Sequence, residues 1–320
     1  MSVLITGGGG LVGIHVAKAL GKLGERVICV DVKPPPAHAA YILDGSADQV
    51  TYIRGDILDR GFVAETIDRY RIEGVVHAAA IVNERAFRED PARGFETNCV
   101  GTLNVLEAAR QLGLRRVVYA SSATVYGPRA SSSPIPEEPP APESLYAESK
   151  YIGERLLERY RTVYRIDALT VRISTAYGPG KPWMPERYPL QRLLWEAMRG
   201  NHFRMAEGGD YLRDFTFISD TALGVCLAYR AVSPGYSVYN IASGASHTLA
   251  EVASVLNTLF PGAGIEIGPG RFENDFALAG SFRGPLDIRR AAEDLGFRPR
   301  YGVKQGLEAY AAFLRQHPPE

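Results

Sequence analysis

The chain has 320 residues, of which 46% are hydrophobic, and its 36 Lys and Arg residues balance 36 Asp and Glu residues. A chain of this length can bury roughly three quarters of its unfolded surface, which is enough for one large domain or two linked ones. The zero formal charge predicts neither a nucleic-acid partner nor binding to an anionic membrane surface.

Features of the chain outside its motifs predict a cytoplasmic location. No apolar run is long enough to span a bilayer, and the chain opens directly into a strand rather than a signal peptide. Cys29, Cys99 and Cys226 lie far apart among apolar neighbours, which is typical of reduced packing residues. The six histidines lack metal-ligand spacing, so we expect no metal site.

A glycine-rich stretch near the start of the chain predicts a strand, a tight turn and a helix. Gly7 and Gly10 allow close approaches that a Cβ would block, and Gly13 lets the helix pack against its strand. The free N–H groups at the helix start, where Leu11 and Val12 lie, would face an anion such as a pyrophosphate. The alternative is a strand–helix–strand unit that binds no ligand, because glycines also end strands for structural reasons.

Acidic residues follow the next two predicted strands. The strand 26–30 ends at Asp31, which can bind both hydroxyls of an adenosine ribose and repel a 2′-phosphate. Asp31 therefore favours NAD over NADP, although the nearby Lys33 leaves NADP open. After the third strand, Asp56 and Ile57 can bind and pack on an adenine; alternatively or in addition, Asp56 caps the following helix.

The fourth predicted strand, 74–77, runs into a stretch of small residues, Ala78, Ala79 and Ala80. Small side chains there would let the backbone pass close to a bulky cofactor. A patterned helix is predicted over 94–112, with the polar Asn98 on its buried face. We expect Asn98 to hold a local distortion or a buried water near the site.

The fifth predicted strand, 116–120, delivers Ser121 and Ser122 at its carboxyl end. Ligands bind at this edge in open parallel sheets. Four strand–helix units of this kind predict an α/β fold of the Rossmann type, with a doubly wound parallel sheet.

A tyrosine and a lysine four residues apart suggest the chemistry. Ser144 is a plausible N-cap for a helix that places Tyr146 and Lys150 on one face. A free tyrosine has a pKa of ~10, but a lysine ammonium and an oxidised nicotinamide beside it would favour the phenolate. The phenolate could take a hydroxyl proton while hydride leaves to the nicotinamide, with Ser122 bonded to the same hydroxyl.

The second half of the chain predicts a smaller α/β substrate-binding domain. We expect residues 1–174 and about 216–243 to bind the cofactor, and about 175–215 and 244–320 to bind substrate. A strand is predicted over 215–218, with Asp220 capping the next helix. Arg213 is our candidate for a diphosphate contact, and a salt bridge is the alternative.

Together these motifs resemble the extended short-chain dehydrogenase/reductase family of NAD-dependent nucleotide-sugar epimerases and dehydratases. The resemblance covers nearly the whole chain and rests on Thr6-Gly7-x-x-Gly10-x-x-Gly13, Asp31, Asp56-Ile57, His77-x-Ala79-Ala80, Asn98-x-x-Gly101-Thr102, Ser121-Ser122, Tyr146-x-x-x-Lys150, Arg172, Tyr177-Gly178-Pro179, Arg213-Asp214-Phe215 and Asp220. Within the family, the run from Ser121 to Gly127 looks most like UDP-glucose 4-epimerases. The 4,6-dehydratases carry an Asp-Glu pair where this chain has Ala123-Thr124, which disfavours elimination of water.

The resemblance implies an epimerase that oxidises C4 of a nucleotide sugar and reduces it again. Tyr146, Lys150 and Ser122 would be the catalytic residues. The residues implied to bind NAD are Gly7, Gly10, Leu11, Val12, Gly13, Asp31, Asp56, Ile57, Ala78, Ala79, Ala80, Asn98, Tyr146 and Lys150. Those implied to bind substrate are Ser122, Thr124, Thr175 and Arg213. It also implies a homodimer built on the two helices after Gly94 and Tyr146.

Two alternatives stay open. A net dehydrogenase of a sugar or other secondary alcohol is one, because Thr175 stands where epimerases usually carry Asn. The late family arginine also lacks a clean match, since Arg271 and Arg283 are both offset. A non-catalytic NAD-binding sensor or scaffold is the other, against which the intact Ser122, Tyr146 and Lys150 argue.

Overall fold

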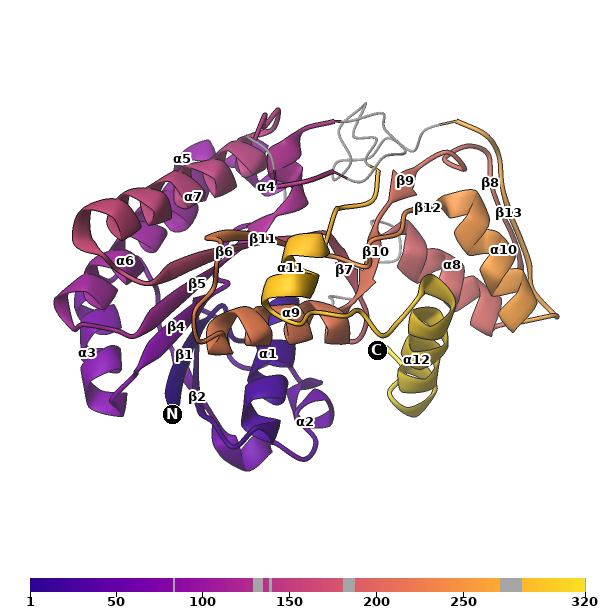
Figure 1. Cartoon of the computed structure of the whole chain (residues 1–320). Helices are drawn as coiled ribbons and strands as arrows, with labels where there is room; N and C mark the ends of the chain where they lie inside the picture. Colours follow the sequence, from indigo (N-terminus) through magenta and orange to yellow (C-terminus); the bar gives the residue numbers. More distant parts are fainter. Residues whose placement is uncertain (83, 129–134, 138–139, 181–187, 271–283, 320) are drawn as a thin grey trace.

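The computed structural model describes residues 1–82, 84–128, 135–137, 140–180, 188–270 and 284–319. At its centre lies a seven-stranded sheet (Figure 1). Its strands, in spatial order, are β11 (Val238–Ile241), β6 (Ala168–Ile173), β5 (Arg116–Ser122), β4 (Gly74–His77), β1 (Ser2–Thr6), β2 (Arg26–Asp31) and β3 (Val50–Arg54). Every neighbouring pair is parallel, which confirms the predicted doubly wound sheet.

Helices cover both faces of the sheet (Figure 1). One face carries α3 (Arg60–Tyr70), α6 (Gly101–Gln111) and α7 (Leu145–Tyr164), and the other carries α1 (Leu11–Lys22) and α9 (Ile218–Arg230). Successive strand side chains point to opposite faces. In β1, Leu4 accordingly packs with α3 and α6, whereas Val3 and Ile5 pack with α1 and α9. Burial on both faces explains why these strands are continuous apolar runs.

The second half of the chain builds a separate group of elements on the right of Figure 1. These are α8 (Pro189–Met198), α10 (Leu249–Leu259), α12 (Val303–Gln316) and the strand pairs β8 (His202–Met205) with β13 (Gly264–Ile267), β9 (Leu212–Arg213) with β12 (His247–Thr248), and β7 (Thr175–Tyr177) with β10 (Phe215–Phe217). Leu193, Leu256 and Leu307 lie in the core of this group. The helix α11 (Arg289–Asp294) packs instead on the main sheet, through Ala291. The division into two domains stays a prediction.

The predicted helix over 94–112 is wrong in its bounds and its regularity. The structure has α5 (Pro91–Phe95), a π-helical turn (Glu96–Val100) and then α6, and the side chain of Asp90 caps α5. Asn98 lies in the π-helical turn. In this wider turn, the side chain of Asn98 makes hydrogen bonds to the backbone of a different segment, at Ile81.

The predicted role of Asp220 as a helix cap is also wrong. The helix α9 begins at Ile218, so Asp220 lies inside its first turn. One oxygen of its carboxylate accepts hydrogen bonds from the backbone N–H groups of Arg300 and Tyr301, both at 2.9 Å. Asp220 therefore ties α9 to the segment that precedes α12.

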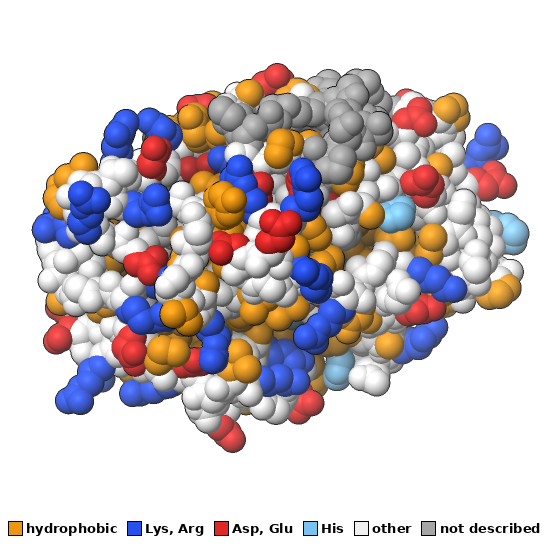
Figure 2. Space-filling model, in the orientation of Figure 1, with side chains coloured by type: hydrophobic (Ala, Val, Ile, Leu, Met, Phe, Trp, Pro, Cys, Tyr) orange, Lys and Arg blue, Asp and Glu red, His pale blue; other side chains and the backbone are white. Residues whose placement is uncertain are grey.

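The remaining described elements are short: α2 (Ala39–Ile42), α4 (Glu84–Glu89) and 3₁₀ turns at Ala47–Gln49 and Ala123–Tyr126. None of the described helices has the length and apolar character needed to cross a membrane. On the face in Figure 2, basic and acidic side chains are interspersed rather than gathered by sign.

Candidate active site

The glycine turn between β1 and α1 is built for close packing. The φ angle of Gly7 is +70°, and a Cβ there would lie 2.7 Å from backbone atoms of Ala79. A Cβ on Gly13 would lie 2.2 Å from the carbonyl oxygen of Gly7. The N-cap of α1 is Gly10, which offers no side-chain hydrogen bond to the first turn. A turn that only glycine can form therefore leaves the helix start open to an anion, as a dinucleotide diphosphate requires.

Asp31 ends β2 beside this turn. One of its carboxylate oxygens accepts a hydrogen bond from the N–H of Gly9 at 3.1 Å, and the other accepts one from the N–H of Lys33 at 3.1 Å. The carboxylate is therefore held next to the glycine turn, where a ribose bound over the turn would meet it.

Asp56 does not cap the helix that follows it, so that interpretation is wrong. Asp59 is the N-cap of α3, accepting a hydrogen bond from the N–H of Phe62. Asp56 instead accepts from the N–H of Leu58 at 3.0 Å and pairs with Arg93 at 3.1 Å. The neighbouring Ile57 is buried in the core between β4 and α6.

The small residues after β4 pass directly against the glycine turn. The N–H of Ala78 donates to the carbonyl of Thr6 at 3.1 Å, which continues the alignment of β4 with β1. The side chain of Asn98 accepts from the N–H of Ile81 at 2.8 Å and donates to its carbonyl at 3.0 Å. Asn98 thus ties the π-helical turn to the residue that follows Ala78, Ala79 and Ala80, and its predicted role in the cofactor site stays a prediction.

Ser122 lies at the carboxyl end of β5, at the edge predicted to bind ligands. Its hydroxyl accepts a hydrogen bond from the N–H of Thr124 at 3.2 Å and so caps the 3₁₀ turn that follows. The hydroxyl of Thr124 is buried and has no hydrogen-bond partner among the residues that the structure describes. A buried hydroxyl of this kind is a candidate for a substrate hydrogen bond.

Tyr146 and Lys150 lie one turn apart on α7, which packs along β5 and the 3₁₀ turn. As predicted, Ser144 caps this helix by accepting from the N–H of Ala147 at 3.1 Å. The helix and strand approach closely, since a Cβ on Gly153 would lie 2.3 Å from the Tyr119 hydroxyl. The side chain of Lys150 extends over the ring of Tyr119, 4.4 Å from its centroid.

Lys150 is buried, and burial shifts the protonation equilibrium of its side chain. Burial lowers the pKa of its ammonium to about 7, and the nearby carboxylate of Glu154 opposes part of that lowering. Both protonation states are therefore accessible near neutral pH. Lys150 can act as a local positive charge whose presence depends on its surroundings.

The sequence prediction missed a buried polar network behind this pair. Glu154 accepts hydrogen bonds from the hydroxyl of Ser121 at 2.5 Å and from Arg172 at 2.7 and 3.0 Å. Arg172 also donates to the hydroxyl of Tyr126 at 3.0 Å. The network links α7 to β5 and β6 directly behind Ser122. Glu154 stands four residues after Lys150, on the same face of the helix, and this spacing is the sequence signal that could have indicated it.

The structure brings Thr175 and Arg213 into neighbouring segments. The N–H of Thr175 donates to the carbonyl of Asp214 at 3.1 Å. Arg213 is only 5% exposed, and its guanidinium lies 3.9 Å from the centroid of the Tyr211 ring. Burial lowers the pKa of this guanidinium. Its role as a diphosphate contact stays a prediction.

The carboxylate of Asp214 fixes this region. It accepts hydrogen bonds from the hydroxyls of Thr216 and Ser243 and from the N–H groups of Ser243, Gly244 and Leu286. One buried acid next to Arg213 therefore joins three segments of the chain, at Thr216, at Ser243 and Gly244, and at Leu286. The offset arginines, Arg271 and Arg283, lie outside the described residues.

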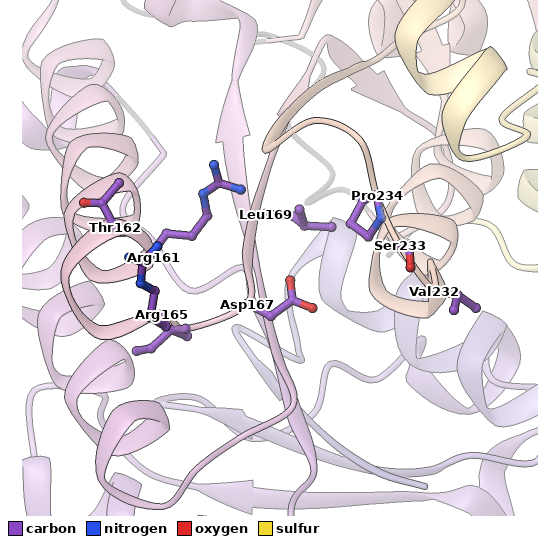
Figure 3. A pocket seen from close by; sticks show the side chains of 9 residues that line it. Arg161, Thr162, Arg165, Asp167, Leu169, Val232, Ser233 and Pro234 are labelled. Carbon is purple, nitrogen blue, oxygen red and sulfur yellow. The ribbon is translucent and has the colours of Figure 1, made fainter.

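A surface cavity lies at the other end of the sheet (Figure 3). Its volume is about 460 Å³, and Arg161, Arg165, Asp167, Val232 and Ser233 contribute to its lining. These residues precede β6 and β11, whereas Ser122 follows the carboxyl end of β5. The cavity is therefore separate from the candidate active site. In the described part of the chain, no group of three or more His, Cys, Asp or Glu residues is arranged to hold a metal ion.

A parallel sheet with an open glycine turn, an acid after β2 and a Tyr–Lys pair beside β5 define a dinucleotide-dependent enzyme. Residues 3–242 match the model of the NAD-dependent epimerase/dehydratase family. The chain therefore belongs to this family, and its cofactor is NAD.

Relatives and solved structures agree with the family assignment. The chain is 28% identical to a UDP-glucose 4-epimerase of Mycolicibacterium smegmatis, covering 98% of this chain and 99% of the relative. It is 29% identical to a dTDP-glucose 4,6-dehydratase of an Actinoplanes species, covering 98% of each. The crystal structure of the Thermus thermophilus UDP-glucose 4-epimerase in complex with NAD superimposes with a TM-score of 0.83 at 26% identity, covering 99% of this chain and 100% of that one.

Proposed function

We propose that this protein is an NAD-dependent 4-epimerase of a UDP-hexose, of the UDP-glucose/UDP-galactose type. The observation that carries the proposal is the placement of Tyr146 and buried Lys150 on one turn of α7, alongside the strand that ends at Ser122. The epimerases among the relatives and the solved structures support the choice of reaction within the family.

The side chains divide the chemistry between them. NAD, which the glycine turn between β1 and α1 and the carboxylate of Asp31 would hold, would supply the hydride acceptor and donor for C4 of the sugar. Tyr146 takes the proton of the C4 hydroxyl and gives it back, which requires a phenolate during oxidation. The Lys150 ammonium favours that phenolate, because an opposite charge nearby stabilises the ionised form. Ser122 orients the hydroxyl by a hydrogen bond.

Elimination of water is not supported by the residues present. The positions that carry an acid pair in dehydratases hold Ala123 and Thr124, which lie in the 3₁₀ turn directly after Ser122. Neither side chain can exchange a proton as a carboxyl group would. A 4,6-dehydratase activity is therefore not expected, despite the similarity to the Actinoplanes enzyme.

Incubation of the purified protein with UDP-glucose or UDP-galactose, followed at the absorbance of NADH, tests the proposal. An epimerase interconverts the two sugars without net NADH, a dehydrogenase accumulates NADH, and a sensor binds NAD without turnover. UDP-glucuronic acid is tested in parallel, because one of the similar solved structures is a UDP-glucuronic acid 4-epimerase of Bacillus cereus. Replacing Tyr146 with Phe is expected to lower turnover by about 10² or more, with NAD binding retained.

Two further features are part of the proposal. The protein forms a homodimer through the helices that follow Gly94 and Tyr146, as the family resemblance implies. It lies in the cytoplasm, consistent with three free cysteines. Size-exclusion chromatography with light scattering measures the first feature directly.

A further inference from the structure

Side chains make hydrogen bonds to both backbone groups of Tyr146, its N–H and its carbonyl. Its N–H belongs to the first turn of α7, where backbone donors have no partner within the helix. This N–H donates to the carboxylate of Glu84 at 3.1 Å. Glu84 is 62 residues away in sequence and opens the short helix α4.

The carbonyl of Tyr146 is held from the other side. It accepts a hydrogen bond from the Ser149 hydroxyl at 2.7 Å. That hydroxyl in turn accepts one from Asn98 at 2.9 Å, and Asn98 bonds to both backbone groups of Ile81. Both peptide groups of Tyr146 are therefore connected to the segment after β4, one directly through Glu84 and one through Ser149 and Asn98.

Glu84 is itself firmly placed. Only 7% of it is exposed, and its second carboxylate oxygen lies 3.8 Å from the guanidinium of Arg88. One turn along α4, Phe87 is fully buried against Gly94, where a Cβ would lie 2.4 Å from its ring. The ring of Phe87 also lies 6.2 Å from that of Tyr146. A buried carboxylate needs partners to offset its lost hydration, and the N–H of Tyr146 is the partner that α7 provides.

We propose that Glu84 is a positioning residue for the epimerase reaction, an inference that rests on the proposed function. The segment between β4 and α4 carries Ala78 to Ala80, which lie against the glycine turn of the cofactor site. Through Glu84, the same segment determines where the phenol of Tyr146 lies. The cofactor loop and the catalytic tyrosine thus form one hydrogen-bonded unit, and hydride and proton transfer keep their relative geometry.

The test compares three variants at saturating NAD. Glu84→Ala removes the acceptor, Glu84→Gln keeps an acceptor oxygen without the charge, and Glu89→Ala is the matched control from the same helix. Glu89 is exposed and pairs with Arg85. Displacements of about 1 Å can cost about 10² in rate, so we expect Glu84→Ala to lower kcat by about tenfold to a hundredfold. KM and the affinity for UDP should stay within about threefold, because Glu84 contacts the tyrosine backbone.

Glu84→Gln should recover at least about half of kcat, and Glu89→Ala should equal the parent protein. A kcat of Glu84→Ala within twofold of the parent would overturn the proposal, as would a Gln variant as impaired as the Ala variant. If Glu84→Ala does not fold, Ser149→Ala removes the side-chain hydrogen bond to the other peptide group of Tyr146, at its carbonyl. The same loss of kcat at constant KM is then expected, and an unchanged kcat refutes the proposal. A parent protein that is inactive on every UDP-sugar would instead contradict the proposed function.

Discussion

Replacing Lys150 with Met is expected to make the cofactor-free protein more stable and far less active. Lys150 is buried, and burial lowers the pKa of its ammonium from 10.5 to about 7. Each pKa unit corresponds to about 1.4 kcal/mol, so the charged lysine opposes folding by about 5 kcal/mol. The contact of the ammonium with the face of the Tyr119 ring stabilises the folded state by up to about 2 kcal/mol, which offsets part of this cost. A methionine at this position has no charge to bury and therefore lacks both contributions. The expected net gain in unfolding free energy is therefore about 3 kcal/mol at or below pH 7.

The pH dependence of the stability follows from the lowered pKa of Lys150 in the folded protein. Between about pH 7 and 10.5 the unfolded chain binds a proton at Lys150 that the folded chain has lost. The stability of the parent protein must therefore rise with pH across this window, as far as Lys150 contributes. The advantage of Lys150→Met is largest at or below pH 7 and disappears towards pH 10.5.

Activity should change in the opposite direction. Without the ammonium, the phenol of Tyr146 loses a cation that favours its ionisation, and turnover at pH 7 should fall by about 10² to 10³. Urea unfolding of cofactor-free protein at pH 7 and 9 measures stability, and sugar interconversion measures activity. Lys304→Met, an exposed change on α12, is the control. A Lys150→Met variant that is less stable than the parent at pH 7, or that keeps a tenth of its turnover, would refute the reasoning.

Three further predictions concern cofactor and substrate binding. Gly13→Ala places a Cβ 2.2 Å from the carbonyl oxygen of Gly7, so NAD affinity measured by calorimetry should fall at least about tenfold. Asp31→Asn removes the charge that repels a 2′-phosphate, so the ratio of NADP to NAD affinity should rise by about tenfold. Arg213→Met should weaken UDP binding by about tenfold to a hundredfold, because a charge-assisted hydrogen bond is worth about 1.5–3 kcal/mol; unchanged affinity would place the diphosphate elsewhere.

The amino-acid sequence by itself determined the features that depend on local geometry. The glycine spacing produced the tight turn at Gly7, and the Ser144 cap and the four-residue spacing placed Tyr146 and Lys150 on one face of α7. The order of apolar runs and helices was enough to predict the parallel sheet, since each strand is buried on both faces. These features follow from backbone conformation and side-chain period over a few residues.

Only the tertiary structure decided which distant groups meet. Asn98, in the π-helical turn, bonds to the backbone of Ile81, and Asp220 bonds to a segment 80 residues away rather than capping its own helix. Glu84 likewise accepts a hydrogen bond from the Tyr146 amide, and Glu154 from Arg172, because the fold brings these distant segments together. A buried polar group must find a partner wherever packing places one, and a local pattern such as the spacing of Glu154 from Lys150 does not specify which distant residue that partner is.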